Sequence, residues 1–568
     1  MHIDVVPNRG SRPAYLLRES FRDGAKVRKR TLANLSSLSD AQILAIRAVL
    51  RGEALQRPEA LFEAITSRAQ GHVQAVRVAM QRLGLEALLG ARPSPERDRV
   101  LAMVGARILA PHTKLATTRW WHTTTLAEDF GVAGCDENDL YAAMDWLLAR
   151  QDRIQKKLAA RHLSPGGLVL YDLSSSYFEG STCPLARLGY SRDGRRGLLQ
   201  VNYGLLTDTR GCPVAVSVHE GNVADSHTLM PEVKRLREVF GLGHLVMVGD
   251  RGMISHKVIA ELRETDGIGW ITALKSASIR ALVEQGELQL GLFDERNLFE
   301  LSSPQYPGER LVACRNPQLA KLRAHKREEL LAATETNLQK IKARVDAGKL
   351  TGADQIGLRV GKVIHQYKVA KHFELAIGEA SFTFARKHES IAAEAALDGL
   401  YLIRTSVSPA QMDSADCVRH YKALANVERA FRSLKTIDLK VRPIHHRLAD
   451  RVRAHIFLCM LAYYVEWHMR EAWRELMFAD TDQAAKARRD PVAPAKRSRA
   501  ALAKVARHTL EDGTPAHSFC TLLAELATIV RNTCRTPSAG PEAPSFDILT
   551  TPNAKQRRAL ELIQHIRL

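Results

Sequence analysis

Two short apolar runs, each ending on an aspartate, place the strongest constraint on the fold of this chain. Residues 167–171 lead into Asp172, and residues 245–249 lead into Asp250. Such runs are typical of buried strands, and a carboxylate at the end of one costs free energy unless something compensates its charge. A helix N-cap or a surface salt bridge explains either aspartate alone. Two of them on strands that lie side by side favour a cation site.

The chain around these aspartates alternates between strand and helix patterns. Within residues 166–279, three strand patterns are followed by a helix, a strand, a second helix and a further strand. This order predicts a mixed α/β sheet. The strand pattern resumes at 399–404, so we interpret 280–395 as an α+β insertion into the core rather than as a tandem domain.

The pattern along the whole chain predicts six parts. They are a basic β-hairpin segment with its turn at Asp23 and Gly24 (1–38), a helical DNA-binding or dimerisation region (39–162), the first part of the α/β core (166–279), the insertion (280–395), the second part of the core (396–478) and a basic tail (479–568). Residues 484–508 hold eight Lys or Arg against a single acid, which is typical of a flexible basic arm.

The charge of the chain favours a polyanionic partner. It has 82 Lys and Arg against 62 Asp and Glu, a formal net charge of +20. Phosphate backbones are the commonest partners of such a surplus, although charge alone does not exclude a basic protein without a nucleic-acid role. A hydrophobic fraction of 45% with 25% charged residues is ordinary globular composition and excludes collagen-like chains and wholesale disorder.

Eight cysteines are scattered along the chain without a Cys-x-x-Cys pair. This spacing argues against a zinc ribbon or a disulfide scaffold and favours reduced thiols. The longest apolar run, 456–465, is about half as long as a membrane span, and the N-terminus lacks a signal-peptide pattern. We therefore expect a cytoplasmic protein with no membrane partner.

A third acid is available on a later helical segment. At helical spacing Tyr421, Glu428, Arg432 and Lys435 fall on one stripe beside an apolar one. A solvated helix face has this composition, and so does a face that offers one metal ligand and several phosphate contacts. The Gly-flanked loop 191–197, with Arg192 and Arg195, similarly suits either a phosphate grip or an exposed hairpin tip.

These segments resemble one family. The spacing of residues 421–435 is similar to the Tyr-Arg-Glu-Lys motif of bacterial insertion-sequence transposases with an Asp-Asp-Glu active site, with Leu424 where the motif usually has arginine. Residues 171–180 resemble the first-aspartate segment of that family. Residues 221–222 and 249–253 resemble its second-aspartate region.

The resemblance implies a ribonuclease H-like fold with an insertion between Asp250 and Glu428. It implies Asp172, Asp250 and Glu428 as catalytic residues and metal ligands, with DNA contacts expected at Tyr421, Arg429, Arg432, Lys435, Arg192, Arg195 and Arg251. Two divalent ions roughly 4 Å apart can activate the attacking group and stabilise the leaving oxygen of a phosphodiester. Mg²⁺ prefers such oxygen ligands, with Mn²⁺ as an alternative.

The expected activity is therefore metal-dependent cleavage at insertion-sequence ends followed by strand transfer into target DNA. The expected partners are both DNAs and a second copy of the chain in the synaptic complex, with nucleoid association when DNA is bound. The alternatives are a ribonuclease H-like nuclease without strand transfer and a catalytically inactive DNA-binding repressor. The intact acids argue against the repressor.

Sequence recognition is expected in residues 1–160, because metal chemistry on a phosphodiester carries no sequence information. The basic arm at 484–508 competes for this role, but a flexible Lys/Arg run mostly supplies sequence-independent affinity. The remaining alternative is that residues 39–162 only pair two protomers.

Overall fold

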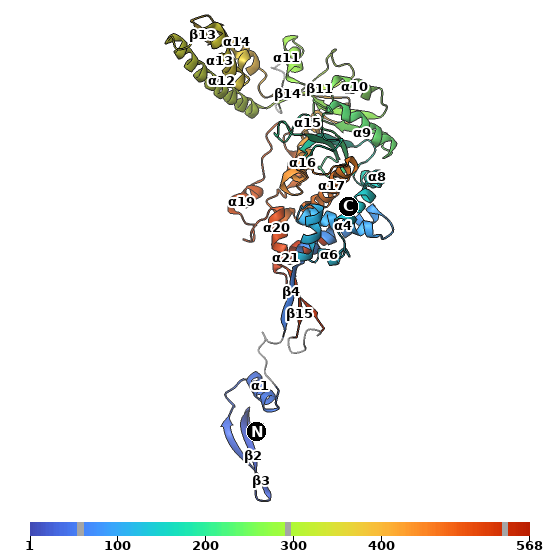
Figure 1. The fold of residues 1–568 in the computed structure, drawn as a ribbon, viewed down its shortest axis with the longest axis vertical. Helices are drawn as coiled ribbons and strands as arrows, with labels where there is room; N and C mark the ends of the chain where they lie inside the picture. The colour runs from blue at the N-terminus through green and yellow to red at the C-terminus, as the bar shows by residue number, and fades with distance from the viewer. Residues whose placement is uncertain (54–61, 290–292, 294–296, 537–543) are drawn as a thin grey trace. The chain divides into compact units, whose positions relative to one another are not determined.

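The computed structural model describes all residues except 54–61, 290–292, 294–296 and 537–543 (Figure 1). The chain divides into two compact units. One contains Met1–Ala69 with Ile529–Thr551, and the other contains Gln70–Thr528 with Pro552–Leu568.

The first unit holds two antiparallel sheets. Strands β1 (His2–Asn8), β2 (Ser11–Asp23) and β3 (Lys26–Asn34) pair in sequence order, and β2 turns into β3 where Asp23 pairs with Lys26. The basic run of the N-terminal segment lies on β3, an edge strand with every residue exposed. Helix α1 (Asp40–Leu50) follows, begun by a capping box on Ser39. The second sheet has the order β16 (Phe546–Leu549), β15 (Val530–Arg535), β4 (Glu63–Ala69).

An eight-stranded mixed sheet forms the centre of the second unit, counted over the residues that the structure describes. Its order is β10 (Leu298–Leu301), β11 (Arg310–Arg315), β14 (Leu400–Thr405), β9 (Ile268–Ala273), β8 (Leu245–Val248), β5 (Leu168–Tyr177), β6 (Gln200–Thr207), β7 (Pro213–Glu220). Strands β5, β6 and β7 pair antiparallel, whereas β5, β8 and β9 pair parallel. The predicted mixed α/β sheet is confirmed.

The parallel pairing of β5 with β8 fixes where the two aspartates lie. Leu170 pairs with Val248. Asp172 and Asp250 each follow that pair by two residues, so they lie at the same level of neighbouring strands. Asp250 lies just past the end of β8, as predicted, whereas Asp172 lies midway along β5, because the strand continues to Tyr177 through its pairing with β6.

The segment interpreted as an insertion starts later than the sequence indicated. Strands β10 and β11 lie within 280–395 but belong to the large sheet, because the buried run Leu311–Cys314 of β11 pairs antiparallel with β14. The elements that leave the sheet are α12 (Pro317–Asp346), α13 (Ala353–Gln366), β12 (Phe373–Ile377), β13 (Phe382–Arg386) and α14 (His388–Ala395). They share a separate apolar core around Leu338, Ile356 and Phe373.

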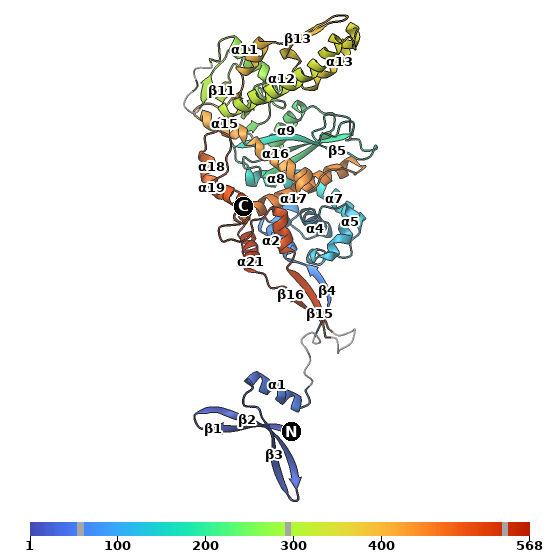
Figure 2. The same ribbon diagram turned by 90° about the vertical axis from the view of Figure 1, so that its left-hand side faces the viewer.

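Helix α17 (Ala449–Ala472) is the buried axis of the second unit. Nearly all its residues from Val452 to Met469 are buried. It packs against α2 (Gly71–Arg82), α4 (Pro95–Leu109), α7 (Glu137–Leu148) and β7, as Figure 2 shows. Helix α8 (Gln151–His162) packs on β7 beside them. The helices between 70 and 162 thus complete the core instead of forming a separate module.

The C-terminal part also differs from the expected flexible tail. Residues 484–508 contain α19 (Arg499–Arg507), where the buried Lys504 donates from Nζ to the carbonyl oxygen of Glu475 at 3.1 Å. Helices α20 (Phe519–Leu526) and α21 (Ala554–Gln564) both pack on α2. Apart from Lys504, the buried residues of these helices include the apolar Phe519, Leu522 and Ile563, and a count of charges does not reveal them. Most of the Pro- and Ser-rich stretch between them lies outside the described residues.

In the part of the chain that the structure covers, no helix has the length and apolar character needed to cross a bilayer.

A buried ion-pair cluster joins the start of β11 to β14 and to helix α10 (His256–Arg263). The carboxylate of Glu309 accepts two hydrogen bonds of 2.5 Å from Arg404 and one of 2.6 Å from Arg263. The Glu309 side chain is 0% exposed and that of Arg404 is 4% exposed. Removing one partner of such a pair leaves an uncompensated buried charge.

We expect Glu309→Ala to lower the free energy of unfolding by roughly 3–5 kcal/mol, measured by urea denaturation. The matched control is Glu238→Ala, whose exposed carboxylate lies 3.9 Å from Lys234 and should contribute less than about 0.5 kcal/mol. Equal effects of the two substitutions would contradict the structural role of the cluster.

Candidate active site

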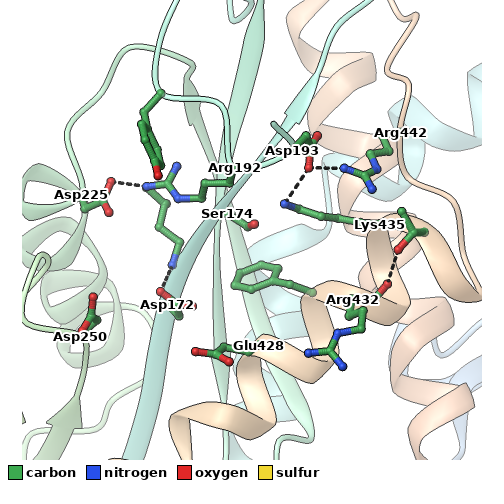
Figure 3. A pocket seen from close by; sticks show the side chains of 14 residues that line it. Asp172, Ser174, Arg192, Asp193, Asp225, Asp250, Glu428, Arg432, Lys435 and Arg442 are labelled. Atoms are coloured by element: carbon green, nitrogen blue, oxygen red, sulfur yellow. Dashed lines mark hydrogen bonds and ion pairs between the residues drawn. The ribbon is translucent and has the colours of Figure 1, made fainter. Parts of the chain in front are cut away.

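Three carboxylates line one cavity of about 500 Å³ (Figure 3). They belong to Asp172 on β5, to Asp250 just after β8, and to Glu428 on α16 (Leu424–Arg432). The other residues that line the cavity are Leu173, Ser174, Tyr190, Arg192, Asp193, Asp225, Phe431, Arg432, Lys435, Thr436 and Arg442.

The sheet positions the two aspartates in different ways. Asp172 lies inside β5, and its Oδ1 accepts a hydrogen bond of 2.8 Å from the backbone N–H of Leu173. Asp250 begins the turn after β8, where its carbonyl oxygen accepts from the N–H groups of Met253 and Ile254 at 2.9 and 3.0 Å. Asp172 is half-buried and Asp250 is exposed.

Helix α16 presents Glu428 through the alternation of its two faces. Val427 and Phe431 are buried, and the Phe431 ring packs edge-on against Tyr203 of β6 at 5.7 Å. Glu428 lies at the border of this buried face, is exposed, and points toward Asp172 in Figure 3. Asn426 fixes the helix against the β6–β7 turn, since its Nδ2 donates to the carbonyl oxygen of Thr209 at 2.9 Å.

The single helix predicted over 421–435 is broken in two places. Helix α15 (Ser414–Lys422) ends just before α16 begins, and α16 continues into a π-helical turn, Ser433–Ile437. This turn changes the direction of side chains relative to an α-helix. As a result Lys435 is buried and lies 3.0 Å from Asp193 Oδ1. It lines the same cavity as Glu428 and Arg432, the other two nearby residues of the predicted stripe.

Burial and mutual repulsion shape the electrostatics of the three acids. Burial of its carboxyl, together with the negative charges of Asp250 and Glu428, raises the pKa of Asp172 to about 7. The Leu173 N–H and the nearby Arg192 act in the opposite direction. Burial and the adjacent Asp250 also raise the pKa of the Tyr421 hydroxyl, which lies 3.4 Å from Asp250 Oδ1.

Cations surround these acids, and three of the cations pair with a further acid. Arg192 donates to Asp225 at 2.5 Å, while Lys435 and Arg442 both pair with Asp193. Asp193 and Asp225 were not singled out in the sequence. Asp193 lies in the loop 191–197, which the sequence did single out, so an acid within that basic loop could have indicated its role. Nothing in the sequence pointed to Asp225 or Arg442.

The predicted DNA contacts divide into two groups. Arg192, Arg432 and Lys435 line the cavity. Tyr421 reaches the site through Asp250, and Arg251 is exposed beside that residue. The cavity lining does not include Arg195 or Arg429: Arg195 lies over the Tyr177 ring at 5.8 Å, and Arg429 donates to Asn426 at 3.3 Å.

Comparison with known proteins agrees with this geometry. A family model described as the transposase DDE domain matches residues 180–465, half of the chain. The chain belongs to the DDE transposases. A second model, the N-terminal domain of the IS1634 family of transposases, matches residues 3–64. This DDE transposase is therefore of the insertion-sequence type.

Two further comparisons give no information about the site. A solved synaptic complex of the piggyBac transposase with hairpin DNA is similar at 9% sequence identity and a TM-score of 0.36, covering 87% of this chain and 82% of that one. No curated protein matches the chain. Asp172 precedes the segment matched by the DDE domain, so its place in the transposase site rests on the cavity described above.

DDE transposases generally use divalent metal ions, and the donor set of this cavity suits them. Its three carboxylates offer only oxygen ligands, which hard divalent cations prefer. Burial, together with repulsion from Asp250 and Glu428, raises the pKa of Asp172, and a bound cation would favour its charged form. Asp172, Asp250 and Glu428 are thus suited to hold such a cation.

The raised pKa of Asp172 predicts a pH-dependent stability of the metal-free protein. An unfolded aspartate titrates near pH 4, so between about pH 4 and 7 only the folded state keeps this proton, and stability falls as pH rises. Asp172→Asn removes the penalty and should raise the free energy of unfolding by up to about 4 kcal/mol near pH 8, with little effect near pH 4.

Urea denaturation over this pH range with a chelator present measures the effect. Adding Mg²⁺ should stabilise the wild type near pH 8 and leave Asp172→Asn almost unchanged. Asp354→Asn, at an exposed position of α13, is the matched control and should keep the wild-type pH slope. An unchanged slope in Asp172→Asn would contradict the assignment.

Proposed function

We propose that Asp172, Asp250 and Glu428 are the catalytic carboxylates with which this transposase cleaves the ends of its insertion sequence and joins them to target DNA. The observation that carries the proposal is the meeting of three acids from β5, the end of β8 and α16 in one cavity bordered by cations. A cavity with this composition suits a phosphodiester held near metal ligands.

The cofactor in this proposal is a pair of Mg²⁺ ions, with Mn²⁺ as a substitute, held by the three carboxylates. When bound, these ions supply an activated nucleophile at neutral pH and stabilise the leaving 3′ oxygen. Because burial favours the protonated form of Asp172, its carboxyl exchanges a proton for the cation near neutral pH.

The surrounding side chains have two proposed roles. Arg192 and Arg432 bind the phosphate backbone. Support for Arg192 is that its buried Nη1 has no hydrogen-bond partner among the described residues, although Nη2 is held by Asp225. Lys435 and Arg442 act instead as positioning residues, because both hold Asp193 and so tie the loop 191–197 to the end of α16.

The assembly in this proposal contains at least two copies of the chain, one for each end of the element. Association with the nucleoid would follow from DNA binding. A nuclease without strand transfer differs from this proposal in its product, since it releases cut DNA and joins nothing.

The first test is cleavage and joining of a duplex that carries the element's own terminal repeats, with Mg²⁺ present. Asp172→Asn, Asp250→Asn and Glu428→Gln should each lower the cleavage rate by roughly 100-fold or more, because each removes charge stabilisation of the transition state. DNA affinity should be kept, since each change removes a negative charge. The exposed Asp354→Asn is the control.

The products separate the alternatives. A joined product from the wild type supports the transposase chemistry, whereas cut DNA alone would indicate the nuclease. Binding of the repeats without any metal-dependent cleavage would indicate the repressor. Full activity in any of the three variants would remove that residue from the catalytic centre.

Recognition of the element ends is proposed for the N-terminal part of the chain. The basic edge strand β3 and helix α1 lie before residue 54, and the IS1634-type N-terminal domain matches this segment. A deletion that extended to residue 162 would strip α17 of its packing partners α4 and α7. A deletion of 1–53 leaves those helices and keeps β4 paired with β15.

We expect the protein that lacks residues 1–53 to lose footprint protection of the terminal repeats while it keeps nonspecific DNA binding. The comparison variant replaces the exposed Lys496, Arg497 and Arg499 with alanine, which should weaken binding to all sequences and reduce its salt dependence. Retained protection after the deletion would move recognition to another part of the chain.

A further inference from the structure

A second group of possible metal ligands lies apart from the three acids. It consists of His162 at the end of α8, Cys212 immediately before β7, and His468 on α17. One ligand atom from each lies within 4.8 Å of the others, and Cys212 Sγ lies 3.7 Å from His468 Nε2. Cys212 and His468 are buried and His162 is half-buried.

The distances fit a tetrahedral zinc ion. Zn–S bonds of about 2.3 Å and Zn–N bonds of about 2.0–2.1 Å separate two such ligands by roughly 3.5 Å. The Cys212–His468 pair already has this separation. Closing the remaining gap within the 4.8 Å limit requires a shift of roughly 1 Å, which rotation of the half-buried His162 side chain can provide.

The protonation states also suit coordination. Burial lowers the pKa of His162, and it lowers that of His468 to about 3, so both imidazoles are neutral and carry a free lone pair. Burial raises the pKa of the Cys212 thiol, so metal binding must release its proton. Among the charged groups that act on these side chains, Arg161 and Arg210 oppose a cation and Asp208 favours one.

We propose that His162, Cys212 and His468 bind one Zn²⁺ ion, with water as the fourth ligand. One thiolate and two imidazoles are borderline-soft donors, which select zinc-like ions over Mg²⁺. The Tyr464 hydroxyl lies 3.0 Å from Nε2 of His162 and orients this ring, as outer partners of zinc-binding histidines do. The site is distinct from the carboxylate cavity, whose lining contains none of the three residues.

Such an ion would stabilise the position of helix α16, which carries Glu428. It would join α8 and α17 to the tight β6–β7 turn, in which Asp208 Oδ1 accepts from the Cys212 N–H at 2.9 Å. The same turn accepts the hydrogen bond from Asn426, two residues before Glu428 on α16. The proposed zinc site is therefore a positioning device for α16.

The chain contains a matched pair that lacks a third ligand. His455 Nε2 and Cys459 Sγ lie 3.9 Å apart, both buried on α17. In the described residues, three possible ligands converge at His162, Cys212 and His468, and this pair is not part of such a group. Cys459→Ser thus controls for the loss of a buried thiol on its own.

The test is titration of the metal-stripped, full-length protein with Co²⁺, followed by the sulfur-to-cobalt charge-transfer absorption band. Carboxylate ligands do not produce this band, so binding at Asp172, Asp250 and Glu428 does not interfere. We expect the band to saturate with one thiolate-bound Co²⁺ per chain in the wild type and in Cys459→Ser, with Zn²⁺ abolishing the band and excess Mg²⁺ failing to do so. Cys212→Ser should lose the band.

His162→Gln is the second variant, because a half-exposed position tolerates substitution better than the buried Cys212. It should keep the band, because Cys212 is still present, but weaken Co²⁺ binding by at least about 100-fold. Loss of a residue that only orients a metal ligand would weaken binding less. Absence of the band in the wild type, its persistence in Cys212→Ser, its equal loss in Cys459→Ser, or unchanged affinity in His162→Gln would overturn the proposal.

Discussion

The parallel pairing of β5 with β8 is the constraint on which the site depends. Because Leu170 pairs with Val248, Asp172 and Asp250 lie at the same level of neighbouring strands, and Glu428 of α16 lines the same cavity. Burial raises the pKa of Asp172 most, and the negative charges of Asp250 and Glu428 raise it further. The charged form of Asp172 is therefore unfavourable without a cation, and this favours metal binding.

The same repulsion explains why the nearby cations carry acidic partners. A free guanidinium beside Asp172 would neutralise the carboxylate and compete with a metal ion. Arg192 is instead held by Asp225, and Lys435 is held by Asp193. Both acids line the same cavity, so the positive charges stay near the three carboxylates in fixed positions. Side chains held in this way lose less conformational entropy when a phosphate arrives.

The sequence predicted those parts of the site that depend on local pattern. Asp172 and Asp250 end apolar runs, and Glu428 has a buried residue beside it at helical spacing, so each could be recognised from its neighbours. Lys435 could not be placed, because the π-helical turn at Ser433–Ile437 changes the periodicity on which the prediction relied. Strands β10 and β11 were assigned to the insertion because they are short and follow the first part of the core in sequence. The sequence of such a strand does not show which strand of the sheet it pairs with.

The two proposed metal sites show the same limit of sequence-based prediction. They also suggest how one chain directs two kinds of metal ion to different sites. His162 and Cys212 are 50 residues apart, and His468 follows Cys212 by 256, so no ligand-spacing rule could join them. Only the packing of α17 against β7 brings them together. Oxygen donors at the sheet edge suit Mg²⁺, whereas thiolate and imidazole donors behind the β6–β7 turn suit Zn²⁺. Because donor type differs, neither ion needs to be excluded sterically from the other's site, and the catalytic cavity can stay open to DNA while the second site stays buried.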